Sequence, residues 1–406
     1  MPRRLRRGFL YSFKNRAALE YECFQMIAQG AKCSVGDQLH PNGKLDGATY
    51  DLIEAVYAQI ENVEAWCEGA RPLAEIGLLS SEGLWQRDWE SLLPEPILGA
   101  TRMLQELGAQ FDIVETATGQ ADFSTYRLLI LPDDLRVDEE LANHLAIFLE
   151  NGGAILGSGE GGLRAGGSDF ALPTWPARRG EPTLDDDGQP FSPDFLVPLE
   201  GFAPDLPRAS HVMYRGGLDL APATDSRVLA RRNLPFFNRT ARHFCSHAHA
   251  PDSERDGGPA IVRRGKIVHF AHPIFTIYRE KAPRWCKILV AAALREILGA
   301  PLLEHSGPST LQAILHEQTA HNRWVLHLLH YVPERRAPGL DIIEEALPLR
   351  DLAFVIRAPK QVVSVRAVPQ NEPLDFVQDG EMLRFRVARV NGHQLVEIAF
   401  LDKETA

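Results

Sequence analysis

The segment YRLLILPDDLRVDEELANHLAIFLENGGAILGS, residues 126–158, carries the strongest signal for the fold class of the chain. It contains a short apolar strand, an amphipathic helix, a pair of glycines and a second apolar strand. Strands that lack alternating polar residues and are joined by a helix are typical of a parallel sheet covered on both faces. The strand AEIGLLS (74–80), the helix PEPILGATRMLQELG (94–108) and the strand FDIVE (111–115) precede this segment. The pattern therefore predicts a doubly wound α/β domain.

The flanking regions have different patterns. Residues 15–30 predict a helix with Asn15 as its N-cap, residues 31–36 a short buried strand, and residues 49–65 a second helix. Residues 163–210 are rich in Gly, Pro and Asp, which predicts a long excursion over the surface. A hairpin is expected to turn at Arg264-Gly265, and a helix follows at 284–299. The alternating apolar and polar residues after position 309 predict a small antiparallel β-sandwich.

Composition narrows the class of protein. The chain has 406 residues, a formal net charge of -11 and 24% charged residues, which argues against nucleic acid as a partner and favours a small or neutral ligand. The basic cluster in residues 1–13 is not followed by an apolar stretch of signal-peptide length, and no run of about 18 apolar residues occurs in the sequence, so we expect a cytoplasmic protein that is not bound to a membrane. The five cysteines form no C-x-x-C pair, and we expect them to be reduced.

Polar residues follow the predicted strand in AKCSVGDQLHP, residues 31–41. In parallel α/β folds, ligand-binding groups gather at the carboxyl ends of strands, and Asp37, Gln38 and His40 occupy such a position. A carboxylate, an amide and an imidazole can bind sugar hydroxyls or exchange protons. The alternative is a turn or helix cap in which Asp37 accepts backbone N–H groups. The residues alone do not decide between these readings.

The segment GSGEGG, residues 157–162, matches the dinucleotide-binding pattern G-x-G-x-x-G. It follows a late strand and leads into LRAGGSDFALP, which is not a helix, so we do not expect a nucleotide site. The same strand end can be interpreted as a nucleophile elbow. Its central position is then Gly159, which carries no nucleophile.

The segment NRTARHFCSHAHAP, residues 238–251, is the third candidate site. Four possible metal ligands alternate in it: His243, Cys245, His247 and His249. Two imidazoles at this spacing can bind one metal ion, as in a metal-dependent hydrolase, or the loop can form the polar wall of a ligand site. No matching carboxylate or distant histidine is evident, so we favour the wall and expect neither metal nor cofactor. Asn238 and Arg239 add donors that suit hydroxyls or carboxylates.

The order of these parts resembles a known family. The stretch from FKNRAALEYECFQMIAQGAKCSVGDQLHP to GARPLAEIGLL, together with FNRTARHFCSHAHAP, VHFAHPIFTIYRE and HLLHYVPERR, resembles glycoside hydrolases of the hypothetical glycosyl hydrolase 6 type. These are related in layout to beta-galactosidases that carry a trimerisation domain. The resemblance implies three parts: residues 1–70 as the end of a (β/α)8 catalytic barrel, residues 71–305 as a flavodoxin-like, amidotransferase-like trimerisation domain, and residues 306–406 as a β-sandwich.

The resemblance also limits what can be carried over. A complete barrel needs roughly 250 residues, far more than residues 1–70 supply, and the two catalytic carboxylates are expected on barrel strands that the sequence does not contain. The catalytic residues are therefore unknown. The resemblance implies that Asp37, Gln38 and His40 contact the substrate, and that Gly159 occupies the nucleophile position of amidotransferases, which makes amidotransferase chemistry unfavourable. In trimeric relatives the second domain also lines the neighbouring active site, a role for the substrate-binding residues Asn238, Arg239, His247 and His249.

The resulting prediction is a glycoside hydrolase of the beta-galactosidase or alpha-L-fucosidase kind, truncated and of doubtful activity alone. It would act on a carbohydrate, without nucleic acid or membrane, and form a homo-oligomer such as a trimer. The alternative is a non-enzymatic carbohydrate-binding or oligomerisation module.

Overall fold

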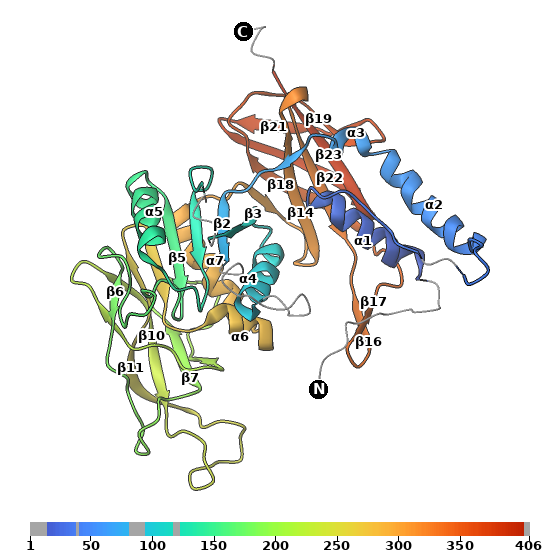
Figure 1. Ribbon diagram of the computed structural model, residues 1–406. Helices are drawn as coiled ribbons and strands as arrows, with labels where there is room; N and C mark the ends of the chain where they lie inside the picture. Colours follow the sequence, from blue (N-terminus) through green and yellow to red (C-terminus); the bar gives the residue numbers. More distant parts are fainter. Residues whose placement is uncertain (1–13, 38–39, 81–93, 117–121, 402–406) are drawn as a thin grey trace. The chain divides into compact units, whose positions relative to one another are not determined.

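The computed structural model describes residues 14–37, 40–80, 94–116 and 122–401 (Figure 1). The chain divides into two compact units. The parallel-sheet unit comprises residues 74–107 and 111–301, and the sandwich unit comprises residues 1–73, 108–110 and 302–406. The predicted boundaries at 70 and 305 stay a prediction, although the contacts group the first and third predicted parts in one unit.

A nine-stranded mixed sheet forms the centre of the parallel-sheet unit. Its parallel part contains β3 (Phe111–Glu115), β2 (Ile76–Ser80), β4 (Leu128–Leu131), β5 (Ala154–Ser158) and β12 (Ile267–Phe270), in that spatial order. Counted along the unit, this is the order 2-1-3-4-5 of flavodoxin-like doubly wound sheets. Every residue of β2, β4 and β5 is buried, as expected for strands that are covered on both faces.

Helices cover both faces of this sheet. Helix α5 (Glu139–Glu150) packs into a hydrophobic cluster on one face, and its N-cap Asp138 accepts a hydrogen bond from the backbone N–H of Leu141. Helix α7 (Arg284–Leu298) contacts β5 and β12 from the other face (Figure 1). Helices α4 (Glu95–Glu106) and α6 (Ile274–Lys281) pack against each other on that side.

A long insertion between β5 and β12 extends the sheet with antiparallel strands. They are β11 (Asp252–Arg264), β10 (Arg227–Pro235), β7 (Asp194–Pro198) and β8 (His211–Met213), while β6 (Ala177–Arg179) pairs with β9 (Leu220–Pro222). The hairpin predicted at Arg264-Gly265 is confirmed, because β11 turns there into β12. The predicted surface excursion over 163–210 is wrong in part, since Leu163, Phe170, Leu172 and Trp175 are buried in the cluster beneath α5.

Two antiparallel sheets form the sandwich unit. The six-stranded sheet contains, in spatial order, β1 (Arg71–Pro72), β14 (Leu311–Gln318), β15 (Arg323–His330), β23 (Gly392–Phe400), β19 (Val362–Val368) and β20 (Glu372–Pro373). The four-stranded sheet contains β13 (Leu303–His305), β18 (Leu349–Arg357), β22 (Met382–Val390) and β21 (Phe376–Asp379). Strands β16 (Glu334–Ala337) and β17 (Leu340–Ile342) form a separate hairpin.

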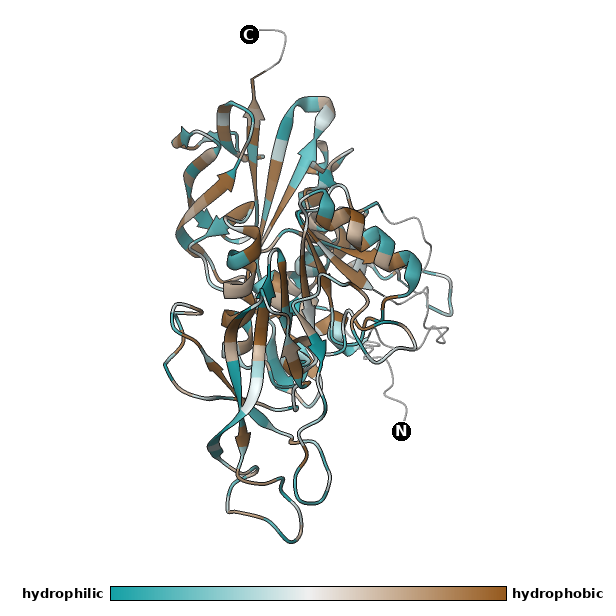
Figure 2. Cartoon of the chain, turned by 90° about the vertical axis from the view of Figure 1, so that its left-hand side faces the viewer, coloured by the Kyte–Doolittle hydropathy of each residue, from teal (hydrophilic) through white to brown (hydrophobic). Residues whose placement is uncertain are grey.

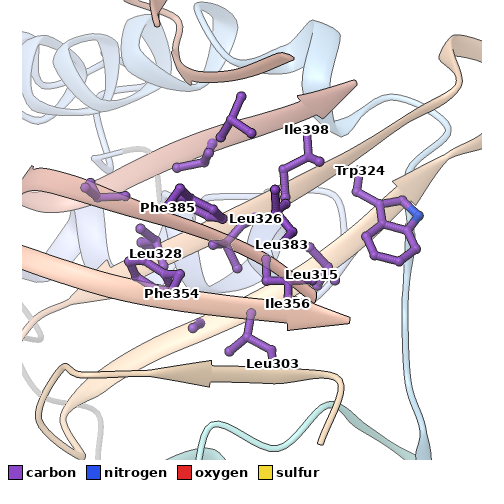
Figure 3. Close-up of a cluster of buried hydrophobic side chains, with 14 of the residues drawn as sticks. Leu303, Leu315, Trp324, Leu326, Leu328, Phe354, Ile356, Leu383, Phe385 and Ile398 are labelled. Atoms are coloured by element: carbon purple, nitrogen blue, oxygen red, sulfur yellow. The ribbon is translucent and has the colours of Figure 1, made fainter. Parts of the chain in front are cut away.

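The core of the sandwich lies between the two sheets. Trp324, Leu326 and Leu328 of β15 meet Phe354 of β18 and Phe385 of β22 there (Figure 3). Because side chains alternate along a strand, the intervening residues of β15 point to the opposite face of the six-stranded sheet. The hydropathy colouring in Figure 2 shows hydrophobic stretches along the central strands and hydrophilic residues in many of the loops.

The N-terminal helices cover that opposite face. Helix α1 (Arg16–Ala28) begins at the predicted N-cap, Asn15, and its Phe24 and Ile27 pack against Val325 and Leu329. Helix α2 (Gly47–Glu61) packs on α1, and the short α3 (Glu64–Cys67) follows it. The sandwich thus has two hydrophobic layers, one between its sheets and one beneath the helices.

The strand predicted at 31–36 is absent. Residues 31–37 have no regular secondary structure and are mostly exposed, and Cys33 and Val35 are only half-buried against α1 and α2. The physical reason is that a single strand needs a neighbour to pair its backbone groups, and the described residues place none beside this segment.

Candidate functional site

The first predicted group of site residues follows the unpaired segment 31–37. Asp37 and His40 are exposed, and Gln38 lies outside the described residues. The carbonyl of His40 accepts a hydrogen bond from the backbone N–H of Gly43 at 2.8 Å, which closes a turn. The side chains of Asp37 and His40 therefore remain accessible to a ligand.

The helix cap considered for Asp37 is made by a different residue. Asp46 precedes α2, and its carboxylate accepts hydrogen bonds from the backbone N–H of Thr49 at 3.1 Å and from the Thr49 hydroxyl at 2.6 Å. These bonds lower the pKa of Asp46, the hydroxyl contributing most. The structural role is thus filled by Asp46, and Asp37 accepts no hydrogen bond from the described part of the chain.

The second predicted group lies in the loop between β10 and β11, here called the histidine loop (residues 236–251). Asn238 anchors this loop to the insertion. Its amide nitrogen donates to a carboxylate oxygen of Asp185 at 2.6 Å and to the carbonyl of Pro190 at 3.0 Å, and its Oδ1 accepts from the backbone N–H of Ser192 at 2.9 Å. Because these bonds use both ends of the amide, Asn238 is a positioning residue.

Contacts within the loop hold the remaining site residues. Arg239 donates to the carbonyl of His247 at 2.6 Å, and the Cys245 thiol lies 3.5 Å from the carbonyl of His249. Arg239 and His247 are exposed, whereas His249 is half-buried beside the rings of Phe195 and Tyr214. The loop therefore presents a guanidinium and an imidazole on its surface.

Two phenylalanines of the same loop were not predicted as site residues. Phe236 is 63% exposed and Phe244 is 68% exposed, so that both large apolar rings face solvent. Exposed aromatic side chains of this size often mark a contact with another molecule. The sequence holds a weak signal for them, because FFNRTARHF places its aromatic residues outside any strand or helix periodicity.

Gly159 lies at the tight turn that follows β5. Its φ of +55° is a left-handed conformation, and a Cβ atom here would lie 3.0 Å from the carbonyl oxygen of Asp133. The backbone N–H of Gly159 donates to the carbonyl of Phe270 at 2.9 Å, and no helix follows the turn. A nucleophile elbow has this strained backbone, but a glycine at the nucleophile position provides no reactive group.

A buried carboxylate lies next to this turn. Asp133 accepts a hydrogen bond from the Ser158 hydroxyl at 2.6 Å and from the backbone N–H of Thr276 at 2.6 Å, at the start of α6. Burial raises its pKa to about 6, although these hydrogen bonds act in the opposite direction. The nearby His269 is fully buried, and desolvation lowers its pKa to about 3. Asp133 thus holds the start of α6 against the end of the sheet, whereas the ring of His269 packs against Phe170 and Trp175.

The described residues contain no group of three or more His, Cys, Asp or Glu side chains that could hold a metal ion. In the histidine loop the contacts of the Cys245 thiol are the carbonyls of His247 and His249. No helix in the described part of the chain is long and apolar enough to cross a lipid bilayer.

The described members of the two predicted groups lie in different units. Asp37 and His40 belong to the sandwich unit, whereas Asn238, Arg239, His247 and His249 belong to the parallel-sheet unit. A joint role for the two groups therefore stays a prediction.

Comparisons with known proteins identify similar solved structures. No protein-family model matches the chain, and no curated protein sequence matches it. An alpha-L-fucosidase isoenzyme 2 from Paenibacillus thiaminolyticus aligns over 97% of this chain and 59% of its own, with 36% identity and a TM-score of 0.89. The beta-galactosidase from Bacillus circulans sp. alkalophilus aligns over 96% of this chain and 53% of its own, with 13% identity and a TM-score of 0.59.

A variant of a GH42 beta-galactosidase from G. stearothermophilus aligns over 95% of this chain and 51% of its own, with 14% identity and a TM-score of 0.58. The chain thus spans between about half and three-fifths of these relatives. At the lower identities the likeness shows the fold alone, whereas the fucosidase structure also shares 36% of the aligned residues. The chain therefore has the fold of a large part of solved glycosidases.

Proposed function

We propose that this chain is part of a glycoside hydrolase that acts on O-glycosidic bonds, of the alpha-L-fucosidase or beta-galactosidase kind. The observation that carries the proposal is the 36% identity and TM-score of 0.89 over 97% of the chain with a structure described as an alpha-L-fucosidase. A likeness that extends through both units at this identity favours a related substrate class, a carbohydrate, over a likeness of fold alone.

The N-terminal region supports a finer version of this proposal. A (β/α)8 barrel ends with a helix, a strand and a helix. The same order occurs here, with helix α1, the unpaired segment 31–37 in the position of the strand, and helix α2. The segment carries apolar residues such as Val35, and no strand of the described residues pairs with it. We propose that parallel strands from further barrel units pair with it in the working enzyme. The two catalytic carboxylates would then belong to those units.

The decisive experiment compares two proteins on nitrophenyl α-L-fucoside and β-galactoside. One is the 406-residue chain, and the other is a version extended by the reading frame upstream of Met1. We expect the extended version to release nitrophenol and the 406-residue chain to release none. Hydrolysis by the 406-residue chain would contradict the placement of the carboxylates outside it. If neither protein acts on any member of a broad glycoside panel, the proposal of a glycosidase is wrong.

Within this function, Asp37, Gln38 and His40 are proposed to contact the sugar at the rim of the barrel. Arg239, His247 and His249 would reach a substrate from the histidine loop, positioned by Asn238. An Arg239→Ala variant of the extended enzyme should raise KM with a smaller effect on kcat, because a guanidinium that grips a hydroxyl acts on ground-state binding. Arg242→Ala is a matched control, since Arg242 is exposed in the same loop and its guanidinium forms no hydrogen bond or ion pair with a described residue.

The second candidate function is an oligomerisation module with affinity for carbohydrate. The exposed Phe236 and Phe244 favour it, because rings with 63% and 68% exposure lose their contact with water when a second copy packs on them. A trimer would let the histidine loop of one copy line the site of the next. Sedimentation velocity of the wild-type chain and of a Phe236→Ser/Phe244→Ser variant tests this. A wild-type monomer, or an assembly unchanged in the variant, would count against it.

A further inference from the structure

The sandwich unit contains a polar cleft that the proposed hydrolysis does not use. Its volume is about 470 Å³, within the range of small-molecule sites. Helices α1 and α2, the end of β15, the segment after β17 and the start of β23 contribute to its lining. The polar residues of this lining include Glu20, Gln59, Tyr331, Glu345, Asn391 and His393.

Hydrogen bonds fix one wall of this cleft before any ligand arrives. The Glu20 carboxylate accepts from Arg16 Nε at 2.8 Å and from the Gln59 amide nitrogen at 2.8 Å, and the Tyr331 hydroxyl lies 3.5 Å from its second oxygen. The Gln59 amide nitrogen also donates to the carbonyl of Ala55 at 3.2 Å. The wall is therefore preorganised, which reduces the entropy that a ligand must offset on binding.

Packing fixes the floor as well. The ring of His393 stacks on Phe24 with centroids 4.3 Å apart, and its Nε2 lies 3.4 Å from Nδ1 of His327. Burial lowers the pKa of His393 to about 3, so the imidazole is neutral near pH 7. A neutral imidazole carries one donor and one acceptor nitrogen.

The charges around the cleft favour a neutral ligand. Glu20 is paired with Arg16, and Glu344 is paired with Arg336 outside the cleft. Within the described residues, the Gln59 amide oxygen and the side chains of Glu345 and Asn391 have no hydrogen-bond partner. A carboxylate offers two acceptor oxygens in one plane, and a side-chain amide offers an acceptor oxygen beside a donor nitrogen. Both arrangements suit two adjacent hydroxyl groups of a ligand.

We infer that this cleft binds a neutral, polyhydroxylated ligand, a monosaccharide or short oligosaccharide. A purely apolar ligand would leave these polar groups without hydrogen bonds, which is costly. A polycation would find only the Glu345 carboxylate unpaired, because Glu20 already accepts from three donors and Glu344 is paired with Arg336. The inference goes beyond the proposed function, because it concerns binding by the sandwich unit and requires no hydrolysis.

Calorimetric titration of the 406-residue chain with L-fucose, D-galactose and the polyamine spermidine tests the inference. We expect saturable binding of at least one sugar and none of spermidine. In a Glu345→Ala/Asn391→Ala variant the affinity for that sugar should fall at least tenfold. Both residues are exposed, so the variant should fold, and its melting temperature checks this. Glu372→Ala, an exposed carboxylate on β20, is the matched control and should leave the affinity unchanged.

Three outcomes would overturn the inference: no saturable binding of either sugar, unchanged sugar affinity in the double variant, or binding of spermidine alone. The nitrophenyl glycoside assay reports on a different property. A catalytically active extended enzyme without sugar binding at the cleft would reject this inference and leave the proposed function intact. If sugar binding depends on Glu345 and Asn391 but the extended enzyme hydrolyses no glycoside, this inference is supported and the proposed function is rejected.

Discussion

The insertion of the parallel-sheet unit depends on a buried ionic network, and removal of its central carboxylate should be strongly destabilising. Asp194 is fully buried; it accepts a hydrogen bond from the backbone N–H of Gly217 at 3.0 Å and contacts Nε2 of His272 at 2.5 Å. The oxygen that accepts from Gly217, Oδ2, also lies 3.2 Å from Nε of Arg232. That distance is within ion-pair range, but the N–H is not aligned for a hydrogen bond.

The expected magnitude follows from what Asp194→Ala leaves behind. The guanidinium of Arg232 would stay buried, held by the carbonyls of Gly217 and Leu218 and, at 3.4 Å, by Asp219. Breaking a buried ion pair by removing one partner costs about 3–5 kcal/mol. Because these contacts partly compensate Arg232, we expect a loss of about 3 kcal/mol, at the lower end of that range.

The neighbouring residue of β10 offers a matched control. Arg231 pairs with Asp256 on the surface, where the two side chains are 42% and 58% exposed. Exposed pairs contribute about 0–1 kcal/mol, so Asp256→Ala should change stability little. The two variants remove the same functional group opposite adjacent arginines and differ mainly in burial.

Amide hydrogen exchange followed by mass spectrometry is the suitable assay, because it assigns a loss of protection to one unit. Two units need not unfold together, and a single unfolding midpoint would not separate them. Asp194→Ala should raise exchange in β7, β10 and β12 about a hundredfold, the factor that corresponds to about 3 kcal/mol, and leave the sandwich strands unchanged. Equal effects of Asp194→Ala and Asp256→Ala would show that burial does not set the contribution of these carboxylates to stability.

Three further predictions concern stability. Burial lowers the pKa of the histidines beneath α1, to about 4 for His316 and well below the ordinary value for His327, so the unfolded state binds more protons below pH 6.5. The free energy of unfolding, measured by urea titration, should keep the full contribution of these histidines above pH 6.5 and decrease as the pH drops toward 4. The decrease should be less steep in the His327→Leu variant. Gly99→Ala would place a Cβ 2.0 Å from the carbonyl oxygen of Phe275 and should cost about 1–3 kcal/mol by thermal denaturation, unlike Arg102→Ala on the same helix. Gly159→Ala should cost about 1–2 kcal/mol because of its positive φ, and an unchanged melting temperature would contradict this.

Elements with strong local signals were predictable from the sequence. The buried strands β4 and β5, helix α5 and the hairpin of β11 and β12 follow from apolar runs, an amphipathic pattern and turn residues. The burial of Phe170 and Trp175 was not, because no periodicity marks a loop that is folded back into a core. The strand predicted at 31–36 is absent for a different reason. Its local pattern is that of a strand, but a strand forms only beside a partner strand, and the local pattern does not reveal whether a partner exists.

The sequence indicated which polar residues belong to the candidate site better than it indicated what each of them contacts. The exposed positions of Asp37, His40, Arg239 and His247 are compatible with the predicted contacts to a ligand. Asn238 differs, because the sequence cannot reveal that Asp185 and Pro190, about fifty positions earlier, use its amide. The polar cleft was missed for the same reason, since it assembles from residues that are hundreds of positions apart.

The order of the strands in the sandwich unit has a consequence for how the chain becomes folded during synthesis. Helix α1 packs on β15 and β23, and β23 ends at Phe400. The parallel-sheet unit can thus complete its core while α1 and α2 still lack the sheet that covers their apolar sides. Until β23 has been synthesised, these apolar faces stay uncovered and prone to aggregate. A stop codon before Gly392 should therefore yield a chain whose parallel-sheet unit is folded and whose amino-terminal helices are exposed to proteases.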